Sequence, residues 1–152
     1  MHRDVKPDNF LLTDDWKVKL IDFAIAQRPA TGLAKLLGSR SKLQGTRSYM
    51  SPEQIRNEGL DIRADIYSFG CMLYELVTAK MPYTGITSDD LLAKHLRAPI
   101  PTVLSLNAQC TNEFAELVMR MMGKRREERP KSMEDFLKLF RAIRVFKAKR
   151  IT

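Results

Sequence analysis

Apolar residues recur at the spacing of an amphipathic helix in four stretches of the chain. Side chains at i, i+3, i+4 and i+7 line one face of an α-helix. The pattern predicts four helices, whose apolar faces form the core of the fold. The residues that mark these faces are Ile66, Phe69, Leu73, Leu76 and Val77; Leu91, Leu92, His95 and Leu96; Phe114, Leu117, Val118 and Met121; and Met133, Phe136, Leu137 and Phe140.

Two of these helices have sequence signals for their first turns. The stretch Thr87-Ser88-Asp89-Asp90 places a hydroxyl three residues before a carboxylate, which resembles a capping box. Ser132 precedes the last apolar stretch and has Asp135 three residues further on. We therefore expect Ser132 to be an N-cap.

The beginning of the chain has a different pattern. Apolar residues 10–12, a turn at Asp14-Asp15 and the alternating stretch 17–21 predict a short β-hairpin. Residues 24–48 contain Gly, Pro, Ser, Thr and scattered Leu without a period, and this length of loop is usually functional or disordered. The chain should be mostly helical, with one hairpin near its start.

Composition excludes several classes of protein. With 152 residues, 44% hydrophobic and 29% charged, the chain fits one globular domain or part of one. The most apolar stretch, residues 67–77, is shorter than the roughly 20 residues of a membrane-spanning helix and contains Glu75. Residues 1–4 do not resemble a signal peptide, so we expect a cytoplasmic location. Cys71 falls in a helical apolar pattern and should be a buried thiol.

The net charge of +8 is concentrated at one end of the chain. Residues 1–118 contain equal numbers of basic and acidic side chains, whereas residues 119–152 contain 12 basic and 4 acidic ones. The last basic residues continue the register of an amphipathic helix, so a solvated helix face is favoured over a binding patch. No DNA or RNA partner is expected, and membrane contact is the less favoured alternative. These residues are Arg141, Arg144, Lys147, Lys149 and Arg150.

Four short motifs follow one another along the chain. They are His2-Arg3-Asp4-Val5-Lys6-Pro7-Asp8-Asn9; Asp22-Phe23-Ala24; Gly45-Thr46-Arg47-Ser48-Tyr49-Met50-Ser51-Pro52-Glu53; and Asp65-Ile66-Tyr67-Ser68-Phe69-Gly70. In order and spacing they resemble the catalytic loop, the metal-binding motif, the end of the activation segment and the central helix of protein kinases. The amino-acid sequences of these motifs are most similar to those of bacterial serine/threonine kinases of eukaryotic type.

This resemblance implies an α+β fold, the mostly helical C-terminal lobe of a protein kinase. Residues 1–142 would form the lobe and residues 143–152 a basic extension. The N-terminal lobe, which covers much of the ATP site, would be a missing partner. The implied activity is transfer of the γ-phosphate of ATP to serine or threonine hydroxyls of proteins, with Mg²⁺. This fragment alone is expected to be inactive.

The resemblance also implies roles for individual residues in the chemistry. Asp4 would accept the proton of the substrate hydroxyl. Lys6 would neutralise the transferring phosphate, and Thr46 would hydrogen-bond both of them. Asn9 and Asp22 would bind Mg²⁺, an ion that prefers oxygen ligands. Outside this pattern, an Asp is usually a turn or cap residue and a Lys a surface charge.

Other matching residues would have structural or regulatory roles. His2 would pack near Phe23, and Arg3 would receive a phosphorylated residue of the activation segment. The carboxylate of Asp65 would bind the catalytic-loop backbone. Glu53 and Arg129 would form an ion pair, whereas Glu75 and Arg63 have no such match and are interpreted as ordinary surface or structural charges.

The sequence departs from the family pattern at two places. Ala24 occupies the position of a family Gly, and residues 123–128 lack the Asp-Pro expected before Arg129-Pro130. A second interpretation is therefore a catalytically inactive lobe, or a truncated remnant, that acts as a protein-binding module. The retained Asp4, Lys6, Asn9 and Asp22 favour the enzyme, since a scaffold has no physical need of a base and metal ligands.

Overall fold

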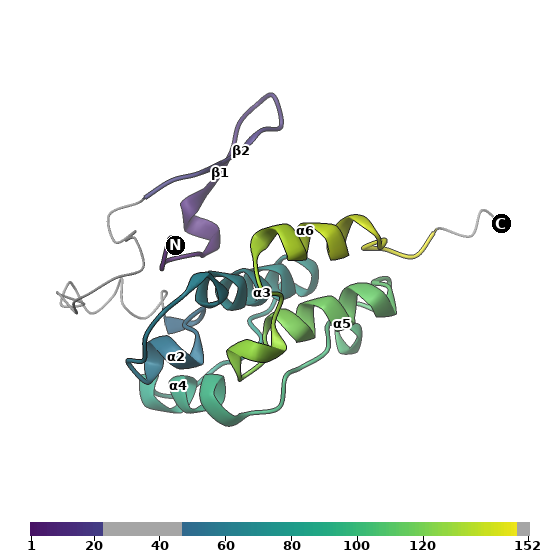
Figure 1. The fold of residues 1–152 in the computed structure, drawn as a ribbon. Coiled ribbons are helices and arrows are strands. Elements are labelled where there is room, and N and C mark those ends of the chain that lie inside the picture. Colours follow the sequence, from purple (N-terminus) through teal and green to yellow (C-terminus); the bar gives the residue numbers. More distant parts are fainter. Residues whose placement is uncertain (23–46, 149–152) are drawn as a thin grey trace.

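A two-stranded hairpin lies beside a bundle of helices in the computed structural model, which describes residues 1–22 and 47–148 (Figure 1). This arrangement is the expected α+β class, with the hairpin and all four helices at the predicted places. The elements are η1 (Pro7–Asn9), β1 (Phe10–Leu12), β2 (Val18–Leu20), α2 (Pro52–Ile55), α3 (Ile62–Thr78), α4 (Ser88–Arg97), η2 (Val103–Ser105), α5 (Asn112–Met121), η3 (Arg126–Glu128) and α6 (Met133–Arg141).

Helix α3 is the central element of the bundle, and nine of its residues between Ala64 and Tyr74 are buried. The prediction of a single apolar face was incomplete, because the polar Asp65 and Ser68 are also buried. In its last turn the prediction was wrong for Leu76, which is 64% exposed. Leu76 lies about 80° from Ile66 around the helix at 100° per residue, so it falls at the edge of the face.

Helices α3 and α5 cross in close contact at Gly70. A Cβ on Gly70 would lie 2.8 Å from Met121 Cβ and 3.1 Å from Met122 Cγ. Both methionines are fully buried, so there is no free space for the neighbours to move into. The absence of a side chain at Gly70 therefore permits the central helix packing.

Aromatic rings connect the hairpin to the bundle. Phe10 of β1 stacks on Phe69 of α3 at a centroid distance of 6.3 Å. Phe69 meets Phe136 of α6 edge-on at 5.5 Å, and Phe136 stacks on Phe140 at 5.5 Å. Such pairs add to the burial of their surface. The pairing of β1 with β2 runs from Phe10 opposite Leu20 to Leu12 opposite Val18, as expected for an antiparallel hairpin.

Both predicted helix starts are confirmed. The Ser132 side chain accepts a hydrogen bond from Asp135 N at 3.2 Å, and the Thr87 hydroxyl accepts one from Asp90 N at 3.1 Å. The capping box at α4 is modified, because the Asp90 carboxylate accepts from Ile86 N at 3.1 Å, one residue before the N-cap.

The prediction that the amphipathic helix continues beyond residue 141 was wrong for Arg144 and Lys147, whereas Lys149 and Arg150 lie outside the described residues. Helix α6 ends at Arg141, and the chain then runs beside residues 109–111. Thr111 N donates to Val145 O at 3.0 Å and Lys147 N to Gln109 O at 2.8 Å, which makes a bridge between Cys110 and Phe146. These backbone bonds compete with further helical turns, and partial burial of Val145 against the core favours the extended form.

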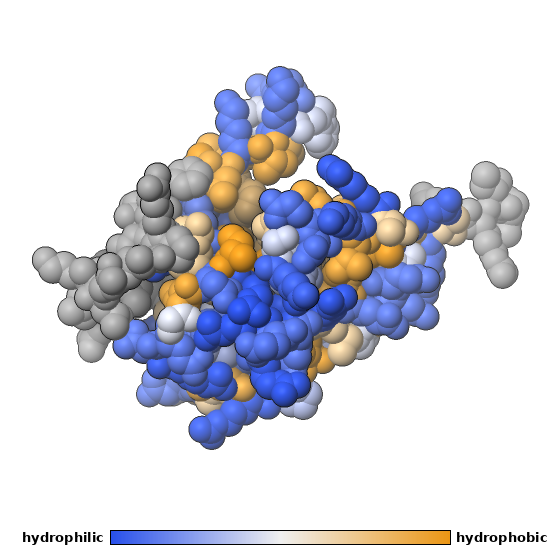
Figure 2. All heavy atoms as spheres, in the orientation of Figure 1, coloured by the Kyte–Doolittle hydropathy of each residue, from blue (hydrophilic) through white to orange (hydrophobic). Residues whose placement is uncertain are grey.

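Apolar side chains remain exposed along the hairpin, and Figure 2 shows hydrophobic surface where the hairpin meets the bundle. Exposed fractions of 60% and 65% at Leu12 and Val18 are large for apolar strand residues. Cys71 is fully buried, as predicted. Among the described residues, no helix is long and apolar enough to cross a bilayer.

A buried ion pair fixes α2 against the rest of the bundle. Arg129 Nη1 and Nη2 donate to the two carboxylate oxygens of Glu53 at 2.6 and 2.9 Å, and both side chains are buried. The guanidinium also donates to the carbonyls of Gly123 and Arg63, each at 2.8 Å, and lies over the ring of Tyr67. Burial by itself raises the pKa of Glu53, but the bonds and charge of Arg129 outweigh it and the net shift is downward.

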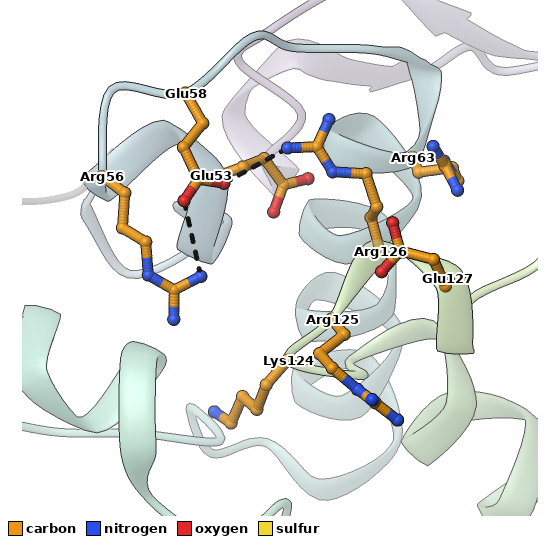
Figure 3. A pocket seen from close by; sticks show the side chains of 8 residues that line it. All are labelled: Glu53, Arg56, Glu58, Arg63, Lys124, Arg125, Arg126 and Glu127. Carbon is orange, nitrogen blue, oxygen red and sulfur yellow. Dashed lines mark hydrogen bonds and ion pairs between the residues drawn. The ribbon is translucent and has the colours of Figure 1, made fainter.

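An arginine of η3, in the stretch that lacks the expected Asp-Pro, makes several contacts with the loop before α3. Arg126 donates to Gly59 O at 2.8 Å and to the Glu58 carboxylate at 3.2 Å, and it lies 3.6 Å from Asp61. These contacts join η3 to the loop between α2 and α3. They belong to a charged pocket of about 450 Å³ (Figure 3), lined by Glu53, Arg56, Glu58, Arg63, Lys124, Arg125, Arg126 and Glu127.

We predict that Gly70→Ala destabilises the fold. Its added methyl costs about 1–3 kcal/mol of overpacking, which exceeds the gain in helix propensity of about 1 kcal/mol. Gly59→Ala is the matched control, since nothing lies within 4 Å of its Cβ position. Urea unfolding should show a lower midpoint for Gly70→Ala alone; equal midpoints would contradict the close crossing.

We also predict that Arg129→Met costs about 3–5 kcal/mol of the free energy of unfolding, because it leaves the Glu53 carboxylate buried without its partner. The control is Arg125→Met, which removes an exposed ion pair with Glu128. Thermal unfolding followed by circular dichroism should separate the two variants clearly. Similar melting temperatures would contradict the importance assigned to the buried pair.

Candidate functional site

Three of the predicted site residues meet in one short loop. The Lys6 ammonium donates to Asp4 Oδ2 at 2.7 Å, with 16% and 12% of the two side chains exposed. Asn9 Nδ2 donates to Asp4 O at 2.6 Å and to Asp4 Oδ2 at 3.2 Å. An ammonium and a carboxamide therefore both contact the carboxylate of Asp4.

The local sequence explains this loop. Pro7 begins the turn η1, where a proline loses no hydrogen bond because the first N–H of a helix has no partner. Asn9 N donates to Lys6 O at 3.1 Å and closes the turn. The turn brings the buried side chain of Asn9 back toward Asp4.

A single carboxylate of the central helix holds the backbone before Asp4. Asp65 accepts from the amides of His2 and Arg3 at 2.6 and 2.7 Å, one bond to each oxygen. Arg3 has a φ of 71°, a left-handed conformation that is uncommon for a residue with a side chain. The contact expected between Asp65 and the loop backbone is thus present.

The hairpin returns the chain to the same loop. Ile21 N donates to Asn9 O at 2.8 Å, and the His2 ring contacts Ile21 O at 3.1 Å. Asp22 follows directly, with a φ of 60° and an exposed side chain. Ile21 is bonded directly to Asn9, and Asp22 is the next residue along the chain. The hairpin therefore brings Asp22 close to Asn9, as predicted.

Tyr49 connects its segment to helix α3. Its hydroxyl donates to Glu75 Oε2 at 2.6 Å, and its carbonyl accepts from Ser68 Oγ at 2.7 Å. Burial, the bond to Glu75 and the nearby negative charges of Glu75 and Asp8 raise the pKa of Tyr49 well above its usual range. Glu75 therefore has a structural role, one of the two expected alternatives, because it anchors this segment to α3.

Some predicted residues lie outside the described part of the chain. These are Phe23 and Thr46, together with the departure at Ala24. Glu53, which lies on α2, and Arg129 form the expected pair. The structure therefore unites Asp4, Lys6 and Asn9, with the backbone of Asp22 close by.

Sequence reasoning missed α2 and its residue Gln54. Ser51 and Gln54 form a reciprocal capping box, with Pro52 at the first helical position. A Ser followed three residues later by Gln, with Pro between, is a sequence signal for a helix start. It was overlooked because the motif through Glu53 had been interpreted as one unit of the activation segment.

The donor set suits a magnesium ion. The carboxamide of Asn9 and the carboxylate of Asp22 supply oxygen, the ligand type that Mg²⁺ prefers. Because Asn9 Nδ2 faces Asp4, the carboxamide oxygen points to the other side. Two side chains are sufficient, since Mg²⁺ at phosphate sites is completed by phosphate oxygens and water.

Comparisons with known proteins agree with this geometry. The protein kinase domain family matches residues 1–139. Serine/threonine-protein kinase PknL of Mycobacterium tuberculosis is 39% identical over 118 residues, which cover 78% of this chain and 29% of that protein. Serine/threonine-protein kinase PknH of Mycobacterium bovis is 38% identical over 135 residues, 89% of this chain and 22% of that protein.

A probable serine/threonine-protein kinase of Clostridium acetobutylicum is 34% identical over 137 residues, 90% of this chain and 20% of that protein. The chain thus spans less than a third of the length of these curated relatives. The match nevertheless extends over the loop, hairpin and helices described above. The chain belongs to the protein kinase family.

Proposed function

We propose that this chain supplies the catalytic loop and helical lobe of a serine/threonine protein kinase. The observation that carries the proposal is the contact of Asp4 with Lys6 and Asn9, in a loop held by Asp65. The related PknL and PknH are named serine/threonine-protein kinases. We call the protein that joins this chain to an N-terminal kinase lobe the complete kinase.

Asp4 is the group that handles the proton in this proposal. A serine or threonine hydroxyl oxygen attacks the γ-phosphorus of ATP while the bond to the bridging oxygen of ADP breaks. The hydroxyl proton passes to the Asp4 carboxylate. Lys6, 2.7 Å from that carboxylate, would stabilise the transferring phosphoryl group with its positive charge.

Asn9 and Asp22 are the residues that would hold Mg²⁺. Bound there, the ion neutralises charge on the phosphates. Asn9 also donates to Asp4, so the same carboxamide fixes the orientation of the base. We propose Ser/Thr side chains of proteins as acceptors on two grounds: the names of the relatives, and Lys6 with Thr46 in the family pattern.

We predict that Asp4→Asn in the complete kinase abolishes phosphoryl transfer and leaves ATP affinity nearly unchanged, because Asp4 acts on the substrate hydroxyl. Asp22→Asn should weaken both, since it removes a metal ligand. Peptide phosphorylation and calorimetric titration with Mg-ATP measure the two effects.

Asp14→Asn, in the exposed hairpin turn, is the control and should retain activity. If Asp4→Asn phosphorylates peptide at the rate of the unaltered kinase, the assignment of the base is wrong. The protein-binding module would then be the better proposal.

The 152-residue chain alone should have negligible kinase activity. Phosphoryl transfer depends on positioning and electrostatic stabilisation, and the N-terminal lobe contributes much of both. Incubation with radiolabelled ATP and a serine peptide tests this, with the complete kinase as the positive control. Robust labelling by the chain alone would overturn the expectation.

A further inference from the structure

The oxygen and the nitrogen of the Gln54 carboxamide form hydrogen bonds with two different parts of the molecule. Its oxygen accepts from Ser51 N at 2.9 Å, within the first turn of α2. Its nitrogen donates to Arg3 O at 3.1 Å, 51 residues earlier in the chain. The first bond caps a helix, but the second leads directly to the residue before Asp4.

The backbone of Arg3 is held from two sides. Its amide donates to Asp65 Oδ1 at 2.7 Å, and its carbonyl accepts from Gln54. With a φ of 71°, this residue has a conformation that persists when surrounding contacts determine it. The peptide group before the Arg3 Cα is therefore held by Asp65 of α3, and the peptide group after it, which leads to Asp4, is held by Gln54.

We infer that Gln54 is a positioning residue for Asp4. This inference rests on the proposed kinase activity and assigns no contact with substrate to Gln54. The Arg3 carbonyl belongs to the peptide bond whose nitrogen is that of Asp4, so rotation of this carbonyl turns the Asp4 side chain. The Gln54 donor prevents that rotation.

The buried ion pair holds the backbone of Gln54 in place. Glu53 precedes Gln54 on α2, and its carboxylate is clamped by both Arg129 nitrogens. Ser51 N holds the Gln54 side chain itself through its bond to Oε1. The carboxamide thus reaches Arg3 from a short helix that is anchored in the core.

The alternative is that Gln54 only caps α2. The two roles can be tested separately, because the carboxamide oxygen makes the capping bond and the nitrogen makes the bond to Arg3. Gln54→Glu keeps an oxygen for Ser51 N but has no donor for Arg3 O. Gln54→Met removes both bonds without adding charge. Ser51→Ala is the matched control: it removes the hydroxyl that accepts from Gln54 N at 3.4 Å, yet leaves both carboxamide bonds possible.

The experiment measures kcat, KM for ATP and amide hydrogen exchange over residues 1–9 in the complete kinase. For Gln54→Glu and Gln54→Met we expect kcat to fall about tenfold or more, because small misplacements of a reacting group have large effects on rate. KM for ATP should stay within about twofold, since Gln54 does not touch the nucleotide. Exchange over residues 1–9 should become faster.

Ser51→Ala should keep kcat and the exchange pattern while its melting temperature falls, as for loss of a cap. An unchanged kcat in both Gln54 variants, or an equal fall in Ser51→Ala, would overturn the inference. If the unaltered complete kinase shows no transfer, the proposed function fails. Exchange over residues 1–9 then decides the positioning role alone, and unchanged protection in both Gln54 variants would refute it.

Discussion

The buried pair of Glu53 and Arg129 is the interaction on which the rest of the structure depends. A guanidinium without exposure is tolerated only when its donors are satisfied, and here it bonds a carboxylate and two carbonyls. Those partners come from α2, α3 and the segment before η3. One side chain therefore sets three elements relative to one another, and α2 in turn presents Gln54 to the loop that contains Asp4.

The sequence was most informative where one physical rule dominates. Helical periodicity and the capping residues Thr87 and Ser132 located the helices, because one face of each is apolar and its first amides need acceptors. It failed where distant partners decide. Nothing local shows that residues 145–147 pair with residues 109–111, or that neighbours surround α3 on several sides.

In the candidate site, too, local contacts were predicted, whereas contacts between distant residues were predicted only in part. Resemblance to the family's catalytic-loop motif identified Asp4, Lys6 and Asn9, whose contacts form within nine residues of chain. The supports of that loop come from residues far away in sequence. The role of Asp65 came from the same resemblance, and the bond from Gln54 to Arg3 was missed because its two residues are 51 positions apart. Side chains that act on a distant backbone have no periodic or local signature.

The two bonds of Asp65 join the loop around Asp4 to helix α3, which carries nine buried residues. Elements that share buried contacts tend to open together, as one cooperative unit. The loop should therefore not unfold locally at a low free-energy cost, as weakly packed segments do. Heating should leave the loop ordered until the bundle itself melts, so loss of the loop structure and global unfolding become a single event.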